Sequence, residues 1–158
     1  MKSVYILDDH DIVRFGLETL ISASGKFRLL GSSSNLADGL VQIDALKPDI
    51  LISDMSMDDS KGLDTVRAVV QAQGERPVLV VSMHDEMLYG EQVLSLGARG
   101  YVMKESAHAT VLPAALEVAE GRTWVSPSLR ERLLGRLRGG GSPSQQGSSD
   151  AVLTQREI

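Results

Sequence analysis

Apolar residues recur along the chain as five short runs, at residues 4–7, 27–30, 50–52, 78–81 and 101–103, of which only the second is interrupted, by Arg28. Runs that are continuous rather than alternating are typical of strands buried on both faces of a parallel sheet. The segments between the runs place apolar residues three and four positions apart, as amphipathic helices do. Glycines fall near the expected helix ends, where a left-handed conformation is often needed: Gly25, Gly74, Gly97 and Gly121.

Alternating strands and helices predict an α/β fold with a doubly wound, five-stranded parallel sheet, because right-handed crossovers place helices on both faces. We expect the strand order 2-1-3-4-5 of flavodoxin-like and CheY-like folds. Periodicity alone does not fix this order. After residue 121 an additional C-terminal helix is expected, with Ser126 as its N-cap and Pro127 in its first turn.

The composition changes along the chain and suggests four parts. Residues 1–121 form the α/β domain, and residues 122–138 form a short strand and helix extension. Residues 139–150 (GGGSPSQQGSSD) have the composition of a flexible linker. Residues 151–158 are too short to fold alone. The leucines of the extension could pack on the domain or on a second chain: Leu129, Leu133, Leu134 and Leu137.

Composition also limits the classes of function. No apolar run approaches the roughly 18 residues of a membrane span. The chain has no cysteine, which excludes disulfides, thiolate metal sites and cysteine nucleophiles. No small-residue cleavage site follows the start of the chain, so we expect no secretory signal and a cytoplasmic protein without membrane association.

Charge is unevenly distributed. Residues 1–121 carry 10 Lys and Arg against 18 Asp and Glu, whereas residues 122–158 carry 6 against 3. Nucleic-acid binding needs concentrated positive charge, so the acidic domain is a poor candidate for it. Any DNA contact would have to come from residues beyond this chain.

The unusual polar residues all fall where predicted strands end. Asp8 and Asp9 follow the first strand, Asp54 ends the third, Ser82 ends the fourth and Lys104 follows the fifth. Open α/β sheets bind ligands at this edge. Clustered carboxylates repel one another unless a cation neutralises them, and Mg²⁺ is suited to carboxylate and phosphate oxygens. Together with a lysine and a hydroxyl, they predict a site for a phosphoryl group and its metal.

Each of these residues also has an ordinary structural interpretation. Asp8 or Asp9 alone is more often a helix N-cap, Ser82 a small residue at a strand end and Lys104 a solvated charge. Asp54 is harder to explain in this way, because an ionisable group ending an apolar strand needs a partner. Their agreement at one edge favours a functional site, although spacing does not name the reaction.

Four segments, DDHDIVRFGL, ILISDM, VVSMHDE and LGARGYVMKES, resemble in order the motifs of receiver domains of bacterial two-component response regulators, NarL/FixJ subfamily. The resemblance covers about residues 2–121. It implies a phosphoacceptor domain of a transcriptional regulator, phosphorylated by a sensor histidine kinase and forming a homodimer on phosphorylation. LTQREI resembles the start of a LuxR-type helix-turn-helix domain, so DNA binding is expected only through the missing remainder of that domain.

The resemblance also assigns roles to individual residues. It makes Asp54 the phosphoacceptor and one of the Mg²⁺ ligands. Asp9 would bind Mg²⁺ directly, Asp8 would assist through water, and the backbone carbonyl of Ser56 would complete the protein's share of the metal shell.

Two contacts to the phosphoryl group and a switch are implied in the same way. Lys104 and Ser82 would each contact a phosphoryl oxygen, and Tyr101 would rotate to report the movement of Ser82. The alternative for Tyr101 is an ordinary half-buried strand aromatic. Beyond self-phosphorylation and self-dephosphorylation at Asp54, no enzymatic turnover is expected.

One segment departs from the family pattern. Met-Pro is common three and four residues after the phosphoacceptor, whereas this chain has Met57-Asp58, followed by Asp59. The added negative charge and the loss of proline's rigidity predict altered phosphorylation kinetics. Met83 and His84 lie beside the expected site, where His84 is more plausible as a loop residue than as a metal ligand.

Three alternatives remain at this point. A stand-alone receiver would act by docking to a partner protein. A phosphohydrolase of the haloacid dehalogenase type would need a second aspartate two residues after the nucleophile, where this chain has Ser56. A flavodoxin would have to hold a cofactor phosphate beside an acidic cluster that repels it.

Overall fold

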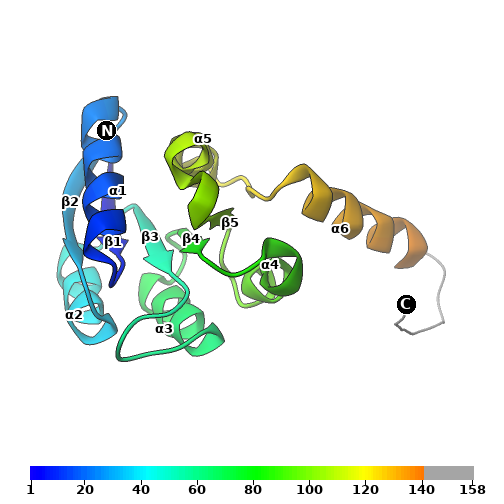
Figure 1. Ribbon diagram of the computed structural model, residues 1–158, viewed down its shortest axis with the longest axis horizontal. Helices are drawn as coiled ribbons and strands as arrows, with labels where there is room; N and C mark the ends of the chain where they lie inside the picture. Colours follow the sequence, from blue (N-terminus) through cyan, green and yellow to red (C-terminus); the bar gives the residue numbers. More distant parts are fainter. Residues whose placement is uncertain (141–158) are drawn as a thin grey trace. The chain divides into compact units, whose positions relative to one another are not determined.

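Five parallel strands form the central sheet, in the order β2-β1-β3-β4-β5 (Figure 1). The computed structural model describes residues 1–140, with side chains described through residue 137. The predicted fold class and strand order are confirmed. The strands are β1 (Lys2–Leu7), β2 (Phe27–Ser33), β3 (Ile50–Asp54), β4 (Val78–Ser82) and β5 (Gly100–Met103).

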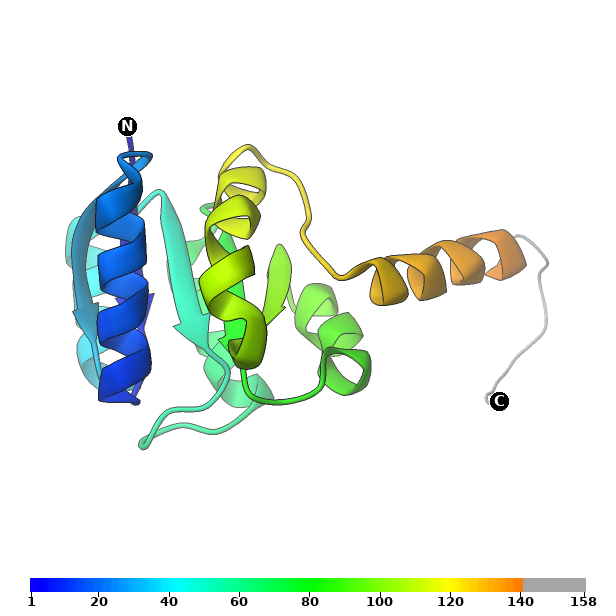
Figure 2. The ribbon, with the colours of Figure 1, turned by 45° about the horizontal axis from the view of Figure 1, so that its top comes forward.

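Helices cover both faces of the sheet, as the alternating pattern predicts. Helices α1 and α5 pack on one face, and α2, α3 and α4 pack on the other (Figure 2). A single 3₁₀ turn, Lys104–Ser106, joins β5 to α5. The helices are α1 (Asp11–Ser24), α2 (Leu36–Leu46), α3 (Leu63–Gln73), α4 (Glu86–Ser95) and α5 (Ala107–Ala119).

Strand residues alternate between two hydrophobic cores, which explains the continuous apolar runs. In β3, Ile50 and Ile52 join the core under α1 and α5, while Leu51 joins the core under the other three helices. All three side chains are fully buried. The glycines predicted at helix ends have positive φ, as at Gly25 (70°), which caps α1, and at Gly121 (88°).

The segment after α5 extends the edge of the sheet beside β5. Trp124 forms a parallel bridge with Gly100, accepts a hydrogen bond from the Tyr101 N–H and donates one to the carbonyl of Arg99, both 3.0 Å long. The Ser126 N–H donates to the buried carboxylate of Glu86 in the first turn of α4, at 2.8 Å. The segment therefore belongs to the first unit of the chain, Met1–Ser126, and is bonded to it as far as Ser126.

The second unit begins with α6 (Pro127–Gly140). The helix starts at the predicted proline and continues two residues into the stretch 139–150 that we predicted as linker. The rest of that stretch and the LTQREI segment lie outside the described residues. None of the helices in residues 1–140 has both the length and the apolar character needed to cross a bilayer.

Gly100 tests the packing between β5 and the Trp124 segment. An added Cβ would lie 2.8 Å from Leu79 Cδ1 and 3.0 Å from the backbone oxygen of Trp124. We expect Gly100→Ala to lower the free energy of unfolding by about 1–3 kcal/mol, as for other overpacked sites. Urea unfolding monitored by circular dichroism measures this change.

Gly16 provides the matched control. It lies in α1, and a Cβ there meets no atom within 4 Å. Gly16→Ala should raise the free energy of unfolding by roughly 0.5–1 kcal/mol, because glycine is unfavourable inside a helix. Equal effects of the two substitutions would show that the space around Gly100 is not restricted.

Candidate functional site

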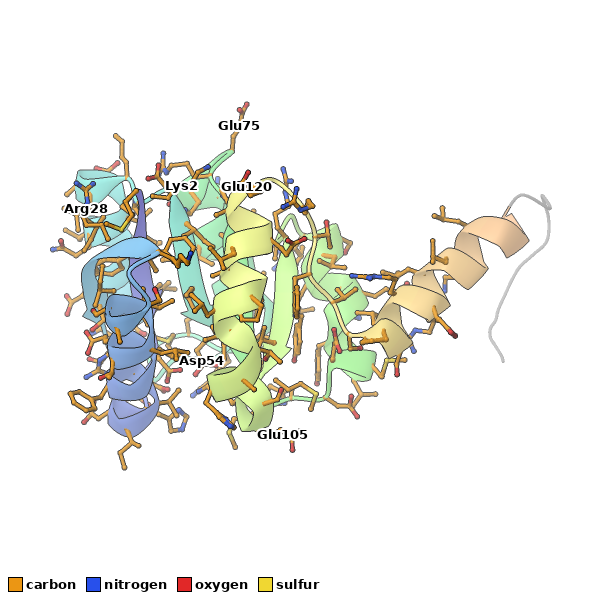
Figure 3. The ribbon with its side chains drawn as sticks, turned by 90° about the horizontal axis from the view of Figure 1, so that it is seen from above. Lys2, Arg28, Asp54, Glu75, Glu105 and Glu120 are labelled. Atoms are coloured by element: carbon orange, nitrogen blue, oxygen red, sulfur yellow. The ribbon has the colours of Figure 1, made fainter. Side chains whose placement is uncertain are left out.

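The predicted carboxylates and lysine meet at the carboxyl end of the sheet. Lys104 Nζ lies 2.8 Å from Asp54 Oδ2 and 3.1 Å from Asp8 Oδ2. The three side chains are 4%, 6% and 1% exposed, respectively. In Figure 3, Asp54 lies at the same end of the domain as Glu105, opposite the end that carries Lys2 and Glu120. One ammonium group therefore joins the loops after β1 and β5 to the end of β3.

A group of side chains suited to a cation surrounds this ion pair. Asp8, Asp9, His10 and Asp54 each offer a ligand atom, and these atoms lie within 4.8 Å of one another. Asp9 Oδ1 is buried and has no hydrogen-bond partner among the described residues. Carboxylate oxygens are the ligands that Mg²⁺ prefers. The donor set and the unpartnered oxygen therefore fit a hard divalent cation.

His10 is a member of this group that our residue assignments did not include. Its Nδ1 lies 3.2 Å from Asp9 Oδ1 and 3.1 Å from Lys104 Nζ. His10, rather than Asp8 or Asp9, is the N-cap residue of α1, and its N–H donates to Asp8 Oδ1 at 2.8 Å. The aspartates therefore do not serve as the helix caps of the alternative interpretation. The sequence signal that could have identified His10 was its place as the third residue of the DDH motif.

The carboxylates carry more negative charge than the nearby lysine balances. The pKa of Asp9 is raised above its usual range, first by burial and then by the charge of Asp54, while His10 acts in the opposite direction. Asp58 also raises this pKa. Lys104 pairs with Asp8 and Asp54 but not with Asp9. The charge left over at Asp9 favours a bound cation or proton.

Asp54 opens into a cleft of about 330 Å³. The Ser56 N–H donates to Asp54 Oδ1 at 3.3 Å, and the Gly62 N–H donates to Ser56 Oγ at 3.0 Å. Met83 and His84 also line the cleft, as expected, and His84 is outside the group of potential metal ligands found among the described residues. Our assignments omitted Lys61. The cleft is lined by Asp9, His10, Asp54, Ser56, Asp58, Lys61, Met83 and His84.

The two acidic residues that depart from the family pattern have different positions. Asp58 lines the cleft. Asp59 instead accepts hydrogen bonds from the N–H groups of Leu36 (2.8 Å) and Ala37 (3.0 Å), at the start of α2. These bonds lower the pKa of Asp59. Only Asp58 therefore adds its charge to the cleft.

Ser82 and Tyr101 are both tied to the loop after β4. Ser82 is buried, and its Oγ accepts a hydrogen bond from the His84 N–H at 3.0 Å. The Tyr101 hydroxyl donates to the His84 carbonyl at 2.7 Å. Tyr101 is only 2% exposed, and burial raises its pKa to about 12. It is therefore more deeply buried than a half-exposed strand aromatic.

Comparison with known proteins gives a consistent match. Residues 4–116 match the family model of the response regulator receiver domain. The chain is 34% identical over 140 residues to NarL of Mycobacterium tuberculosis, a probable transcriptional regulatory protein, and covers 65% of that protein's length and 89% of its own. It also covers 65% of DegU of Brevibacillus brevis, at 26% identity over 98% of this chain.

The structural comparison agrees. The signal receiver domain of NarL from Mycobacterium tuberculosis matches with a TM-score of 0.69 and 32% identity, over 77% of this chain and 98% of that one. A LuxR-family two-component response regulator from Aurantimonas sp. SI85-9A1 matches with a TM-score of 0.77, over 87% of this chain and 99% of that one. Its identity is 24%, so it supports the fold alone.

Asp9 gives a test of the charge excess. Because its pKa is raised above 3.8, the metal-free protein should lose stability as pH rises from that value through the raised pKa. Asp9→Asn removes this loss. At pH 7 with a chelator, we expect its melting temperature to rise by about 2–4 °C, and Mg²⁺ to stabilise it less than the unsubstituted protein.

Asp44 serves as the control because its side chain is 91% exposed on α2, away from the cleft. Asp44→Asn should shift the melting temperature by less than about 1 °C with or without Mg²⁺. A metal-free Asp9→Asn protein that melts below the unsubstituted one would contradict the charge excess.

Proposed function

The chain belongs to the response regulator receiver domain family, and on this basis we propose that it is the phosphoacceptor domain of a transcriptional regulator, modified on Asp54. The observation that carries the proposal is the contact of Lys104 Nζ with both Asp54 and Asp8, within a group of side chains that could hold a cation. A cytoplasmic sensor histidine kinase domain would supply the phosphoryl group.

Mg²⁺ would be held by Asp9, Asp54 and the backbone carbonyl of Ser56, with Asp8 assisting through water. When bound, it neutralises charge on the phosphoryl oxygens. Asp54 is the nucleophile. One of its carboxylate oxygens forms a bond to phosphorus in line with the leaving group, and the bond from phosphorus to the donor breaks with its electron pair leaving on the donor.

Two side chains already in place would then bind the phosphoryl group. Lys104 Nζ, now 2.8 Å from Asp54 Oδ2, would pair with a phosphoryl oxygen of the modified aspartate. The Ser82 hydroxyl would donate to another, and because its oxygen also accepts the His84 N–H, movement of Ser82 would carry the loop with it. Movement of this loop would act on Tyr101, because the Tyr101 hydroxyl is bonded to the His84 carbonyl.

The chemistry would end at the modified aspartate rather than turn over phosphate esters. A haloacid dehalogenase type of enzyme needs an acidic group two residues after the nucleophile. Ser56 occupies that position, and its Oγ accepts a hydrogen bond from the Gly62 N–H. The domain would therefore catalyse only its own phosphorylation and dephosphorylation.

The surface beside the cleft is suited to a protein donor. Ile12 and Phe15 are 88% and 70% exposed on α1, the helix that begins just after the acidic residues. Phe15 also lines a groove of about 430 Å³ that includes residues of α1 and α5. Exposed apolar side chains of this size mark interaction surfaces. We assign this surface to the kinase.

The output would be a homodimer that places a DNA-binding domain on a two-fold site. DNA contact would require a helix-turn-helix domain that begins with the LTQREI segment. The acidic charge of residues 1–121 supports this division, because such a surface repels the phosphate backbone.

Incubation with acetyl phosphate and Mg²⁺ tests the central step. Intact-mass analysis should show one added phosphoryl group, because Asp54 is the proposed acceptor and its side chain lines the cleft. Asp54→Ala should show none, and a chelator should reduce the labelling of the unsubstituted protein at least about tenfold. Labelling that survives Asp54→Ala would place the acceptor elsewhere.

The single tryptophan reports on the proposed movement. Trp124 is hydrogen-bonded through its backbone to Tyr101, so its fluorescence should change when the domain is phosphorylated. Tyr101→Phe removes the bond to the His84 carbonyl. It should leave phosphoryl uptake within about twofold, since Tyr101 touches no reacting atom, but reduce the fluorescence change. If Tyr101→Phe showed the same fluorescence change as the unsubstituted protein, transmission through the Tyr101 hydroxyl would be ruled out.

A further inference from the structure

Asp58 lines the cleft from a turn whose backbone is restrained. The backbone groups of Met57 and Ser60 form two hydrogen bonds across the turn, of 2.6 and 3.2 Å, and Met57 is fully buried. Asp59 fixes the tip of the turn to α2 through its bonds to Leu36 and Ala37. The backbone on both sides of Asp58 is therefore restrained.

Asp58 and Asp9 line the same cleft, and the charge of Asp58 is one of the causes that raise the pKa of Asp9. Two carboxylates in one small cleft repel each other at neutral pH, and a cation between them relieves the repulsion. Among the described side chains, no lysine or arginine pairs with either of them, and Asp9 Oδ1 has only His10 Nδ1 beside it, at 3.2 Å, which is charged only when protonated. With His10 neutral, the Asp9 side of the cleft lacks a compensating positive charge.

The charges around the cleft indicate how much positive charge would neutralise it. With His10 counted as neutral, four carboxylates face two amino groups, so the excess is two negative charges and a divalent cation would balance it. Without Asp58 the same cation would leave the cleft with one net positive charge. The groups counted are Asp8, Asp9, Asp54, Asp58, Lys61 and Lys104.

We propose that Asp58, which lies outside the group that offers ligand atoms, supplies a fourth negative charge to the divalent cation site, on the side of Asp9. This inference rests on the proposed function, because it concerns the cation that supports phosphorylation of Asp54. Asp58 makes cation binding tighter than a neutral residue at this position would. It also leaves the loaded cleft with less positive charge, so that small anionic phosphoryl donors are attracted less strongly.

Direct measurement of cation affinity tests this role without using activity. Free Mn²⁺ can be followed by its electron paramagnetic resonance signal in a titration of the whole chain, and Mg²⁺ can then be added as a competitor. Asp58→Asn removes one charge with little change in shape, and Asp58→Pro places the family's usual residue there. Both should raise the dissociation constants of Mn²⁺ and Mg²⁺ about fivefold, the order expected for one nearby charge in a largely solvated site.

Asp64→Asn is the matched control, because it removes the same charge from an exposed position in the first turn of α3. It should change both dissociation constants by less than about twofold. Circular dichroism establishes that each variant is folded. An equal loss of affinity in Asp58→Asn and Asp64→Asn would overturn the proposal, since the effect would then be one of overall charge.

Two further outcomes separate this inference from the proposed function. Unchanged affinity in Asp58→Asn, in a protein that still binds Mn²⁺ and is labelled at Asp54, would overturn the role of Asp58 alone. Failure of the unsubstituted chain to bind either cation would overturn both the role of Asp58 and the metal dependence of phosphorylation.

Discussion

The contact of one ammonium group with two carboxylates organises the functional end of this domain. Lys104 follows β5, Asp8 follows β1 and Asp54 ends β3, so their ion pairs hold three parts of the chain together. Burying charged groups is costly unless each is paired, and one lysine cannot neutralise two aspartates. The fold is thus built with an unbalanced negative charge. A cation can balance this charge and so allow an anionic phosphoryl group to approach.

The same end of the sheet is linked to the segment that leaves the domain. The His84 backbone bonds to both Ser82 and Tyr101, and the backbone of Tyr101 bonds to Trp124. A few residues later, Ser126 is bonded to the buried Glu86, just after the same loop. These contacts form one contiguous network, which is the physical requirement for a change at Ser82 to be felt at the domain boundary.

The sequence predicted more of the fold than of the site. Continuous apolar runs identified the strands because both faces of the sheet are covered, and strand ends identified Asp54 and Lys104. The strand order was chosen as the one common to flavodoxin-like folds, since periodicity does not encode it. Lys61 was missed because its place at the cleft depends on how separate loops converge, whereas His10 was missed although it follows Asp8 and Asp9 directly. Nothing in the local sequence distinguishes Asp58, which faces the cleft, from Asp59, which binds α2.

The different roles of these two neighbours explain how the chain accommodates an acid where proline is common. Proline restricts φ and would stiffen the turn. Here the hydrogen bonds between Met57 and Ser60 provide that restraint, and Asp59 adds to it by binding the positive end of the α2 dipole. The loop therefore does not depend on proline for its shape. Position 58 is free to carry a charge, and the fixed turn keeps that charge beside Asp9, where it can act on a cation.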